Sequence, residues 1–334
     1  MNHTLLRCCA ALLLIGLGLF WHKPAEAAVS CSGSGMSVSD INFGSVNPLS
    51  GAVDVTGTLS GYTCTNTGNA SSNGNSPQTF ELCFDLLGQN SSPRSMNDSN
   101  GDVLQFELYT DSAHSIVWGN QSYGTPLTTA PFTLPSDSLP HTGPPLTIYG
   151  RVFGGQTSAQ PGNYSDFFSA GQITFTFTNT NGSATPSSCQ NAGTLVTTSA
   201  SFTAKASVTA LCSVNAVTLD FGTPGLLTSA VPSTSSIGVQ CASGVAYNVG
   251  LDGGLHSGNS INARKMVLGA NSVAYQLYRD SGRTAVWGNT VNTNTVSGTG
   301  TGSIQNLTVY GQVPAQTTPP AGTYTDTVVV SVTY

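Results

Sequence analysis

Six cysteines are the residues of this chain best suited to a definite chemistry. They follow an N-terminal segment with the features of a cleaved signal peptide, and exported proteins keep paired cysteines oxidised. We predict disulfides rather than a zinc site, because no Cys-x-x-Cys pair or nearby histidine cluster supplies tetrahedral spacing. The six are Cys31, Cys64, Cys83, Cys189, Cys212 and Cys241.

Hydrolytic chemistry has little support in the sequence. A hydrolase would need His114, His141 or His256 beside a nucleophile, with a carboxylate behind the ring. Neither a Gly-x-Ser-x-Gly elbow nor a paired carboxylate motif occurs. The glycine-rich residues 298–302 (GTGTG) lack the lysine and the following helix of a phosphate loop. We predict no catalytic residue, no cofactor and no metal.

The charge content excludes two classes of partner. Only 7% of residues are charged, and 15 acidic side chains outnumber 9 basic ones. Binding to nucleic acid or to an anionic membrane surface needs clustered lysine and arginine, which are scattered here. We therefore expect no nucleic acid partner.

The second half of the chain repeats the first. Residues 106–112 (FELYTDS) recur as 275–281 (YQLYRDS), and 117–120 (VWGN) recur unchanged as 286–289. A period this long indicates duplication of a domain rather than a short-repeat solenoid. Two copies of one domain therefore stand in tandem.

The repeat also predicts how the cysteines pair. Cys31 and Cys64 stand at places in the first copy that are equivalent to those of Cys212 and Cys241 in the second. Pairing within each set leaves Cys83 and Cys189, which we expect to pair with each other. The predicted disulfides are Cys31–Cys64, Cys212–Cys241 and Cys83–Cys189.

Short strand-like runs separated by turn residues predict an all-β protein. Glycine, serine, threonine and asparagine are abundant, and apolar patterns with a helical period are absent. Runs of this length and spacing favour two tandem immunoglobulin-like β-sandwiches, each large enough to bury its own core. The expected strands include residues 103–109, 173–177, 247–251 and 325–334.

The two copies differ at their leading edges. Arg7, an apolar run at 8–21 and the small residues at 25–27 (AEA) predict a signal peptide over residues 1–27. The first copy then begins almost at its first cysteine. The second copy is preceded by residues 201–210 (SFTAKASVTA), whose alternation of apolar and polar residues is typical of a half-buried strand.

The repeated motifs resemble those of the spore coat protein U domain. They are Phe-Gly after the first cysteine, Leu-Tyr-x-Asp with Val-Trp-Gly, Leu-Thr-[Ile/Val]-Tyr-Gly, and a closing Gly-x-Tyr-x-Asp. The resemblance covers nearly the whole chain after the signal peptide. It implies the pilin module of archaic chaperone–usher pili, and two such modules in one chain look like a tip adhesin.

The resemblance implies a donor-strand mechanism. A pilin sandwich that lacks its last strand leaves a groove, which an extended segment of another chain fills by strand addition. Here we expect the segment 201–210 to complete the first domain within the same chain. The second domain is expected to stay an acceptor. The inward-pointing residues of the donor strand are Phe202, Ala204, Ala206 and Val208.

Adhesion is predicted in features that only the first copy has. The proline-rich insertion at 123–140 carries apolar side chains that we interpret as stiff fingers for an apolar surface. The alternative, that they fold back as a lid over the core, is equally weighted. The candidate binding residues are Leu127, Pro131, Phe132, Leu134 and Leu139, with Pro48, Leu49, Phe167 and Phe168 as weaker candidates.

The sequence thus predicts a non-enzymatic tip adhesin that is exported through the periplasm to the cell surface and mediates attachment and biofilm formation. Its expected partners are a periplasmic chaperone, an outer-membrane usher, the next pilus subunit and an abiotic or host surface. The alternatives are a non-adhesive terminal or adaptor subunit, and a secreted carbohydrate-active enzyme. The predicted domains are the signal peptide at 1–27, the adhesin-like domain at 28–190, a linker and donor strand at 191–210, and the pilin domain at 211–334.

Overall fold

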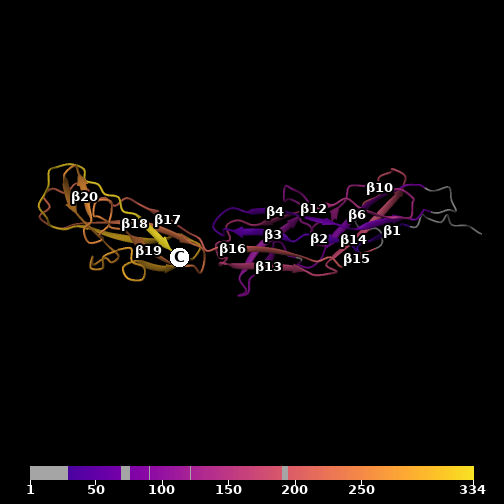
Figure 1. Ribbon diagram of the computed structural model, residues 1–334, viewed down its shortest axis with the longest axis horizontal. Coiled ribbons are helices and arrows are strands. Elements are labelled where there is room, and N and C mark those ends of the chain that lie inside the picture. The colour runs from indigo at the N-terminus through magenta and orange to yellow at the C-terminus, as the bar shows by residue number, and fades with distance from the viewer. Residues whose placement is uncertain (1–28, 69–75, 90, 121, 190–194) are drawn as a thin grey trace, which may run out of the picture.

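The computed structural model describes residues 29–68, 76–89, 91–120, 122–189 and 195–334. The predicted signal peptide lies outside these residues. Every regular element in the described part of the chain is a β-strand, which confirms the predicted all-β class. No helix in this part is long and apolar enough to cross a membrane. Two β-sandwiches lie end to end along one axis (Figure 1).

The first domain contains two facing sheets and a small third sheet. The large sheet has eight strands in the order β2-β4-β12-β8-β7-β13-β16-β3. The facing sheet has the order β10-β6-β14-β15, with β9 also paired to β6, and the small sheet has the order β1-β5-β11. The strands are β1 (Val29–Ser32), β2 (Ser37–Val38), β3 (Ile41–Val46), β4 (Val53–Ser60), β5 (Thr63–Asn66), β6 (Gln78–Leu86), β7 (Arg94–Asn97), β8 (Val103–Tyr109), β9 (Leu127–Thr128), β10 (Phe132–Leu134), β11 (Pro140–Thr142), β12 (Leu146–Val152), β13 (Gly162–Phe168), β14 (Ile173–Asn181), β15 (Val196–Thr197) and β16 (Phe202–Val208).

The second domain has fewer strand pairings than the first. One sheet has the order β17-β18-β24-β22, a second has the order β23-β19-β25, and β20 pairs with β21. The strands are β17 (Cys212–Ala216), β18 (Val231–Cys241), β19 (Ala246–Leu251), β20 (Lys265–Leu268), β21 (Asn271–Ala274), β22 (Gln276–Tyr278), β23 (Val296–Thr299), β24 (Gln305–Val313) and β25 (Val330–Thr333).

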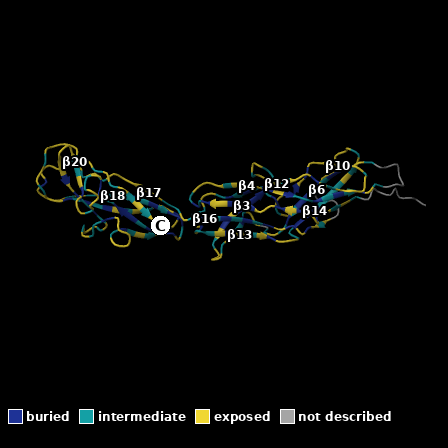
Figure 2. Cartoon of the chain, in the orientation of Figure 1, coloured by how far each residue is buried: buried dark blue, intermediate teal, exposed yellow. Residues whose placement is uncertain are grey.

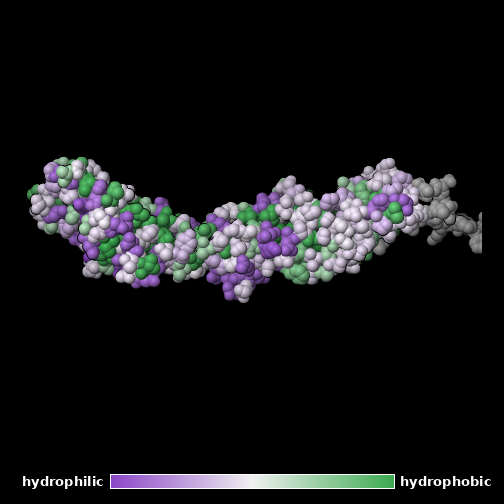
Figure 3. Space-filling model, viewed as in Figure 1, coloured by the Kyte–Doolittle hydropathy of each residue, from purple (hydrophilic) through white to green (hydrophobic). Residues whose placement is uncertain are grey.

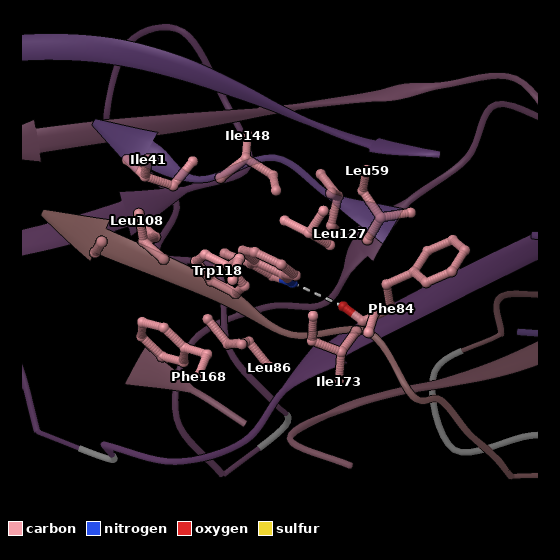
Figure 4. Packing of buried hydrophobic residues seen from close by; sticks show 14 of the residues in the cluster. Ile41, Leu59, Phe84, Leu86, Leu108, Trp118, Leu127, Ile148, Phe168 and Ile173 are labelled. Atoms are coloured by element: carbon pink, nitrogen blue, oxygen red, sulfur yellow. Dashed lines mark hydrogen bonds between the residues drawn. The ribbon is translucent and has the colours of Figure 1, made fainter. Parts of the chain in front are cut away.

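Each sandwich buries its own core (Figure 2), which includes one tryptophan. Figure 4 shows the core of the first domain around Trp118. The indole N–H of Trp118 donates to the carbonyl oxygen of Phe84 at 2.9 Å, and that of Trp287 donates to Val249 at the same distance. Both tryptophans have no exposed surface. Their repetition at equivalent places shows a structural role, because a buried indole needs a partner for its N–H.

A buried arginine donates to the backbone carbonyl oxygen of each tryptophan. The guanidinium of Arg94 donates to the carbonyl oxygen of Trp118 at 2.8 Å and forms an ion pair with Glu107. In the second domain Arg264 donates to the carbonyl oxygen of Trp287 at 2.8 Å and to the side chain of Gln276 at 2.7 Å. Burial lowers the pKa of Arg264.

The structure contains the three disulfides predicted from the repeat. Cys31–Cys64 and Cys212–Cys241 each join two directly opposed residues of neighbouring antiparallel strands, with Cα–Cα distances of 4.0 Å in both. Cys83–Cys189 is found in the first domain alone and fastens the segment after β14 to β6. The two equivalent disulfides therefore link corresponding strand pairs, β1 with β5 and β17 with β18.

Candidate strand-binding groove and surface loop

β16 lies between two other strands in the large sheet of the first domain. It pairs antiparallel with β13 over its whole length, from Phe202 opposite Phe168 to Val208 opposite Gly162. On its other side it pairs parallel with β3, where Ala204 lies opposite Ile41. Residues that precede the second copy in sequence thus lie inside the sheet of the first.

The side chains of β16 alternate between the core and the surface. Phe202 packs on Phe168, with ring centroids 4.5 Å apart and nearly parallel planes, and it also stacks on Trp118 at 6.2 Å. The four side chains expected to point inward are each at most 5% exposed. They are Phe202, Ala204, Ala206 and Val208.

The second domain has no strand at the equivalent place. The counterparts of β3 and β13 are residues 219–224 and 322–328, and neither stretch forms a strand. Leu219 and Phe221 are half-buried, whereas their equivalents Ile41 and Phe43 are 0% and 4% exposed. The apolar side chains that line this gap therefore remain accessible to solvent.

Two adjoining cavities follow this gap. One has a volume of about 500 Å³ and the other about 550 Å³, and both are lined by Leu219, Phe221, Met266 and Tyr324. We call the combined cavity the groove. Figure 3 shows apolar patches over the visible face of the second domain. Further apolar residues of the groove are Leu227, Ile237, Leu251, Val273, Leu277, Val309, Val313, Val328 and Val330.

The groove carries one polar cluster. The hydroxyl of Tyr275 donates to a carboxylate oxygen of Asp326 at 2.7 Å, and the backbone N–H of Leu255 donates to the other at 3.0 Å. Burial is the main cause that raises the pKa of Tyr275. In the first domain the equivalent carboxyl of Asp166 lies opposite Ala204, and burial raises its pKa. One oxygen of Asp166 is buried there without a hydrogen-bond partner.

Both copies keep the same tyrosine hydrogen bond beside this position. The hydroxyl of Tyr164 donates to the carbonyl oxygen of Gln160 at 2.7 Å, and that of Tyr324 donates to Pro320 at 2.8 Å. Tyr164 is 1% exposed under β16, and burial raises its pKa to about 12. Tyr324, without a covering strand, is half-buried. The second domain thus keeps the tyrosine hydrogen bond of the first domain, but no strand covers this tyrosine.

The insertion at 123–140 is not the set of protruding fingers that we expected. Leu127 in β9 and Phe132 and Leu134 in β10 belong to strands that pair with β6. Leu127 and Leu134 are 4% and 6% exposed, and Phe132 stacks on Phe80 with ring centroids 5.8 Å apart. The expectation of protruding side chains is therefore wrong for Leu127 and Leu134, and Phe132 is half-buried. The alternative of a lid describes them better, because their strands extend the facing sheet and cover the core.

Pro131 and Leu139 of the same insertion remain exposed, and Leu139 is 59% exposed. Leu139 stands next to β11, which pairs with the disulfide-linked strand β5. Ser138 donates from its backbone N–H to the carbonyl oxygen of Asn66 at 3.1 Å, and Asp137 accepts from the N–H of Leu139 at 3.0 Å. The loop is thus fastened on both sides of one exposed leucine.

The weaker candidates divide in the same way. Pro48 is buried and Leu49 is half-buried. Phe168 is 2% exposed because it packs on Phe202, whereas its neighbour Phe167 is 62% exposed on the outer face of β13. Of this set, Phe167 is the side chain that solvent reaches most freely. It lies on the flank of the large sheet, apart from the insertion.

The groove is lined by residues that were not named as site residues from the sequence. Leu219 and Phe221 follow Cys212, and Tyr324 belongs to the closing Gly-x-Tyr-x-Asp motif. Their equivalence to Ile41, Phe43 and Tyr164 was the available signal, because those are the residues around β16 in the first domain. In the described residues no group of three or more His, Cys, Asp or Glu side chains could hold a metal ion.

Comparison with known proteins supplies independent information on family and fold. A family model described as the Spore Coat Protein U domain matches residues 23–171 and 198–331. Protein U of Myxococcus xanthus is 34% identical over 154 residues, covering 41% of this chain and 86% of that protein.

Two solved structures are similar over most of the chain. One is the CsuC–CsuE chaperone–tip adhesion subunit pre-assembly complex from the archaic chaperone–usher Csu pili of Acinetobacter baumannii. It is 21% identical, covers 92% of this chain and 100% of that chain, and has a TM-score of 0.52, which shows a shared fold. The CupB6 tip adhesin of Pseudomonas aeruginosa is 9% identical, with 92% and 94% covered, but its TM-score of 0.28 is too low to support an argument.

Proposed function

This chain belongs to the spore coat protein U domain family, and from that premise we propose that it is a non-enzymatic tip subunit of a chaperone–usher pilus. The observation that supports this most is the contrast between its two domains. β16 fills the large sheet of the first domain, while the equivalent place in the second is an open groove. The donor segment is used within the chain, so the protein can accept a strand without offering one. Such a subunit fits one end of a fibre.

The occupant of the groove is proposed from the first domain. An incoming strand runs antiparallel to residues 322–328 and parallel to 219–224, as β16 does against β13 and β3. It places apolar side chains opposite Val328 and Gly322, the equivalents of Phe168 and Gly162. Small residues face Asp326 and Tyr324 between them. We propose that a periplasmic chaperone fills the groove before the next subunit does, and that an outer-membrane usher mediates the exchange.

We propose that adhesion depends on the end of the first domain remote from the second. Leu139 lies beside β11, whose partner strand β5 also pairs with β1. Figure 1 places β1 and β10 at this end. An exposed leucine held between β11 and the hydrogen bond from Ser138 to Asn66 costs little further ordering when it meets an apolar surface. The ligand class that fits is apolar material rather than a charged one.

Replacing Leu139 by Ser is expected to lower attachment of piliated cells to a hydrophobic surface several-fold. Burying one leucine side chain contributes roughly 1.5–3 kcal/mol, and many tips act together on one cell. The measurement is the number of cells retained after washing, at an equal number of pili per cell. Leu195→Ser is the matched control, because Leu195 is 62% exposed on the same domain.

Equal retention of the Leu139→Ser cells and the wild-type cells would favour a non-adhesive terminal or adaptor subunit. A fall in pilus number would instead assign the loop a structural role. A comparable loss with Leu195→Ser would mean that adhesion is spread over the domain surface.

A further inference from the structure

The two domains are joined by almost no free chain. β16 ends at Val208 and β17 begins at Cys212. The backbone N–H of Thr209 donates to the carbonyl oxygen of Val46 at 3.4 Å in the first domain. The carbonyl oxygen of Leu211 accepts from Ala242 at 2.9 Å in the second. A pull on the second domain therefore reaches the end of β16 without first extending a slack linker.

The facing loops of the two domains pack directly on each other. A side-chain carbon added at Gly302 would collide with the backbone of Thr157, and one added at Gly244 would collide with the side chain of Gln160. Thr157 and Gln160 belong to the first domain, and both glycines belong to the second. Close packing at the junction keeps the axis of β16 aligned with the applied load.

The geometry of β16 suits resistance to such a load. It runs along the long axis of the molecule at the junction (Figure 1), with a strand on each side. The hydrogen bonds between strands are directed across the strand axis. A pull along that axis therefore loads the bonds to β13 and β3 together instead of opening them one at a time. The aromatic packing of Phe202 must be lost in the same step.

We infer that β16 is the load-bearing strand of the first domain and that the Cys83–Cys189 disulfide is the stop that limits how far the domain unravels when β16 is pulled out. Cys189 is the first cross-linked residue upstream of β16 in the chain. Its partner Cys83 lies in β6, which is bonded to β14 on one side and to β9 and β10 on the other. Tension on Cys189 thus passes into the best-connected strand of the facing sheet.

The disulfide sets the length of chain that can be released. With Cys83–Cys189 intact, extraction of β16 frees only residues 190–208, which span roughly 65 Å at about 3.3–3.6 Å per residue. Without it, the pull would continue into β14 and strip it from β6. The second domain has no equivalent cross-link. The device is therefore specific to the domain whose last strand leads into its neighbour, and it operates whatever the surface ligand is.

Single-molecule force spectroscopy on the whole chain tests this. The chain is held by ligation tags placed before Val29 and after Tyr334. With disulfides intact, the first domain can release only residues 65–82 and 190–208, roughly 130 Å in total. The Cys83→Ala, Cys189→Ala variant releases residues 65–208, roughly 500 Å, which is about fourfold more. The second domain releases the same length in both proteins and serves as the internal reference.

Two further measurements keep the test decisive if the double variant does not fold. Folded wild-type protein is pulled in a dithiol reductant. The long extension should follow the short one after a delay, because Cys83 and Cys189 are 1% and 0% exposed before β16 leaves. At constant force, Phe202→Ala should shorten the lifetime of the first domain at least tenfold, whereas the outward-facing Thr203→Ala should leave it nearly unchanged.

Two results would overturn the inference. One is immediate reduction of Cys83–Cys189 before any extension, which would mean that β16 does not shield the disulfide. The other is an equal lifetime for the Phe202→Ala and Thr203→Ala proteins, which would mean that β16 does not carry the load.

Discussion

A fusion that adds residues 201–210 after Tyr334 through a short flexible linker is expected to be a soluble monomer whose second domain melts about 10 °C or more above that of the unfused chain. The fused copies of Phe202 and Val208 would enter the groove opposite Val328 and Gly322. Burial of two such side chains contributes roughly 3–6 kcal/mol together, and a domain of this size gains several degrees per kcal/mol. The unfused chain is expected to aggregate or to remain bound to a chaperone, because its groove exposes apolar residues and unpaired backbone.

The measurement is calorimetry combined with size-exclusion chromatography. The geometry favours this fusion, because Figure 1 shows the C-terminus at the junction side of the second domain, where the strand must enter. The control is the same fusion with its added Phe and Val both changed to Asp, which should not raise the melting temperature. An unfused chain that is already monomeric, and no less stable than the fusion, would contradict the open-groove account.

Phe202→Asp is expected to unfold the first domain while the second domain keeps its own transition. The side chain is 2% exposed and packs between Phe168 and Trp118. Truncation of a buried phenylalanine alone costs about 3–5 kcal/mol, and placing an unpaired carboxylate in the same site costs more. The loss is comparable to the whole stability of a typical domain. Calorimetry of the full chain, which resolves one transition per domain, measures the effect.

Ser207→Asp is the matched control for this substitution. Ser207 lies on the same strand but borders a shallow surface depression. Its replacement should change the stability of the first domain by no more than about 1 kcal/mol, as for most surface positions. If Phe202→Asp instead affected the transition of the second domain, β16 would have to be reassigned to that domain.

The alternation of side chains predicted several strands, because burial in a sandwich follows the period of the strand. Residues 103–109 form β8 over the expected range, and 202–208 form β16. Residues 325–334 do not behave as expected: only β25, Val330–Thr333, is a strand. Residues 325–329 have the side-chain pattern of a strand, but the second domain has no equivalent of β16 to pair with them. A sequence shows the tendency to pair and does not show whether a partner is present.

The expectation that Leu127 and Leu134 protrude from the insertion was wrong for a related reason. Phe132 and Leu134 flank Thr133 with the spacing of a half-buried strand, a pattern that also suits β10. The prolines around them favoured the interpretation of a protruding loop. Proline is compatible with the ends of edge strands, and β10 lies at the edge of its sheet. The repeat predicted the disulfides correctly, since equivalent residues occupy equivalent places in both copies.

Hydrogen exchange of the backbone amides of residues 322–328 shows whether the groove is open to a strand. The N–H groups of Tyr324, Asp326 and Val328 make no hydrogen bond within the described part of the chain. In the chain without a donor they should exchange rapidly, while the equivalent amides of β13 are protected by β16. On fusion of residues 201–210 after Tyr334, alternate amides between 322 and 328 should become protected by at least a hundredfold. Protection of these amides before any strand is added, or none after it, would contradict the assignment of an open acceptor groove.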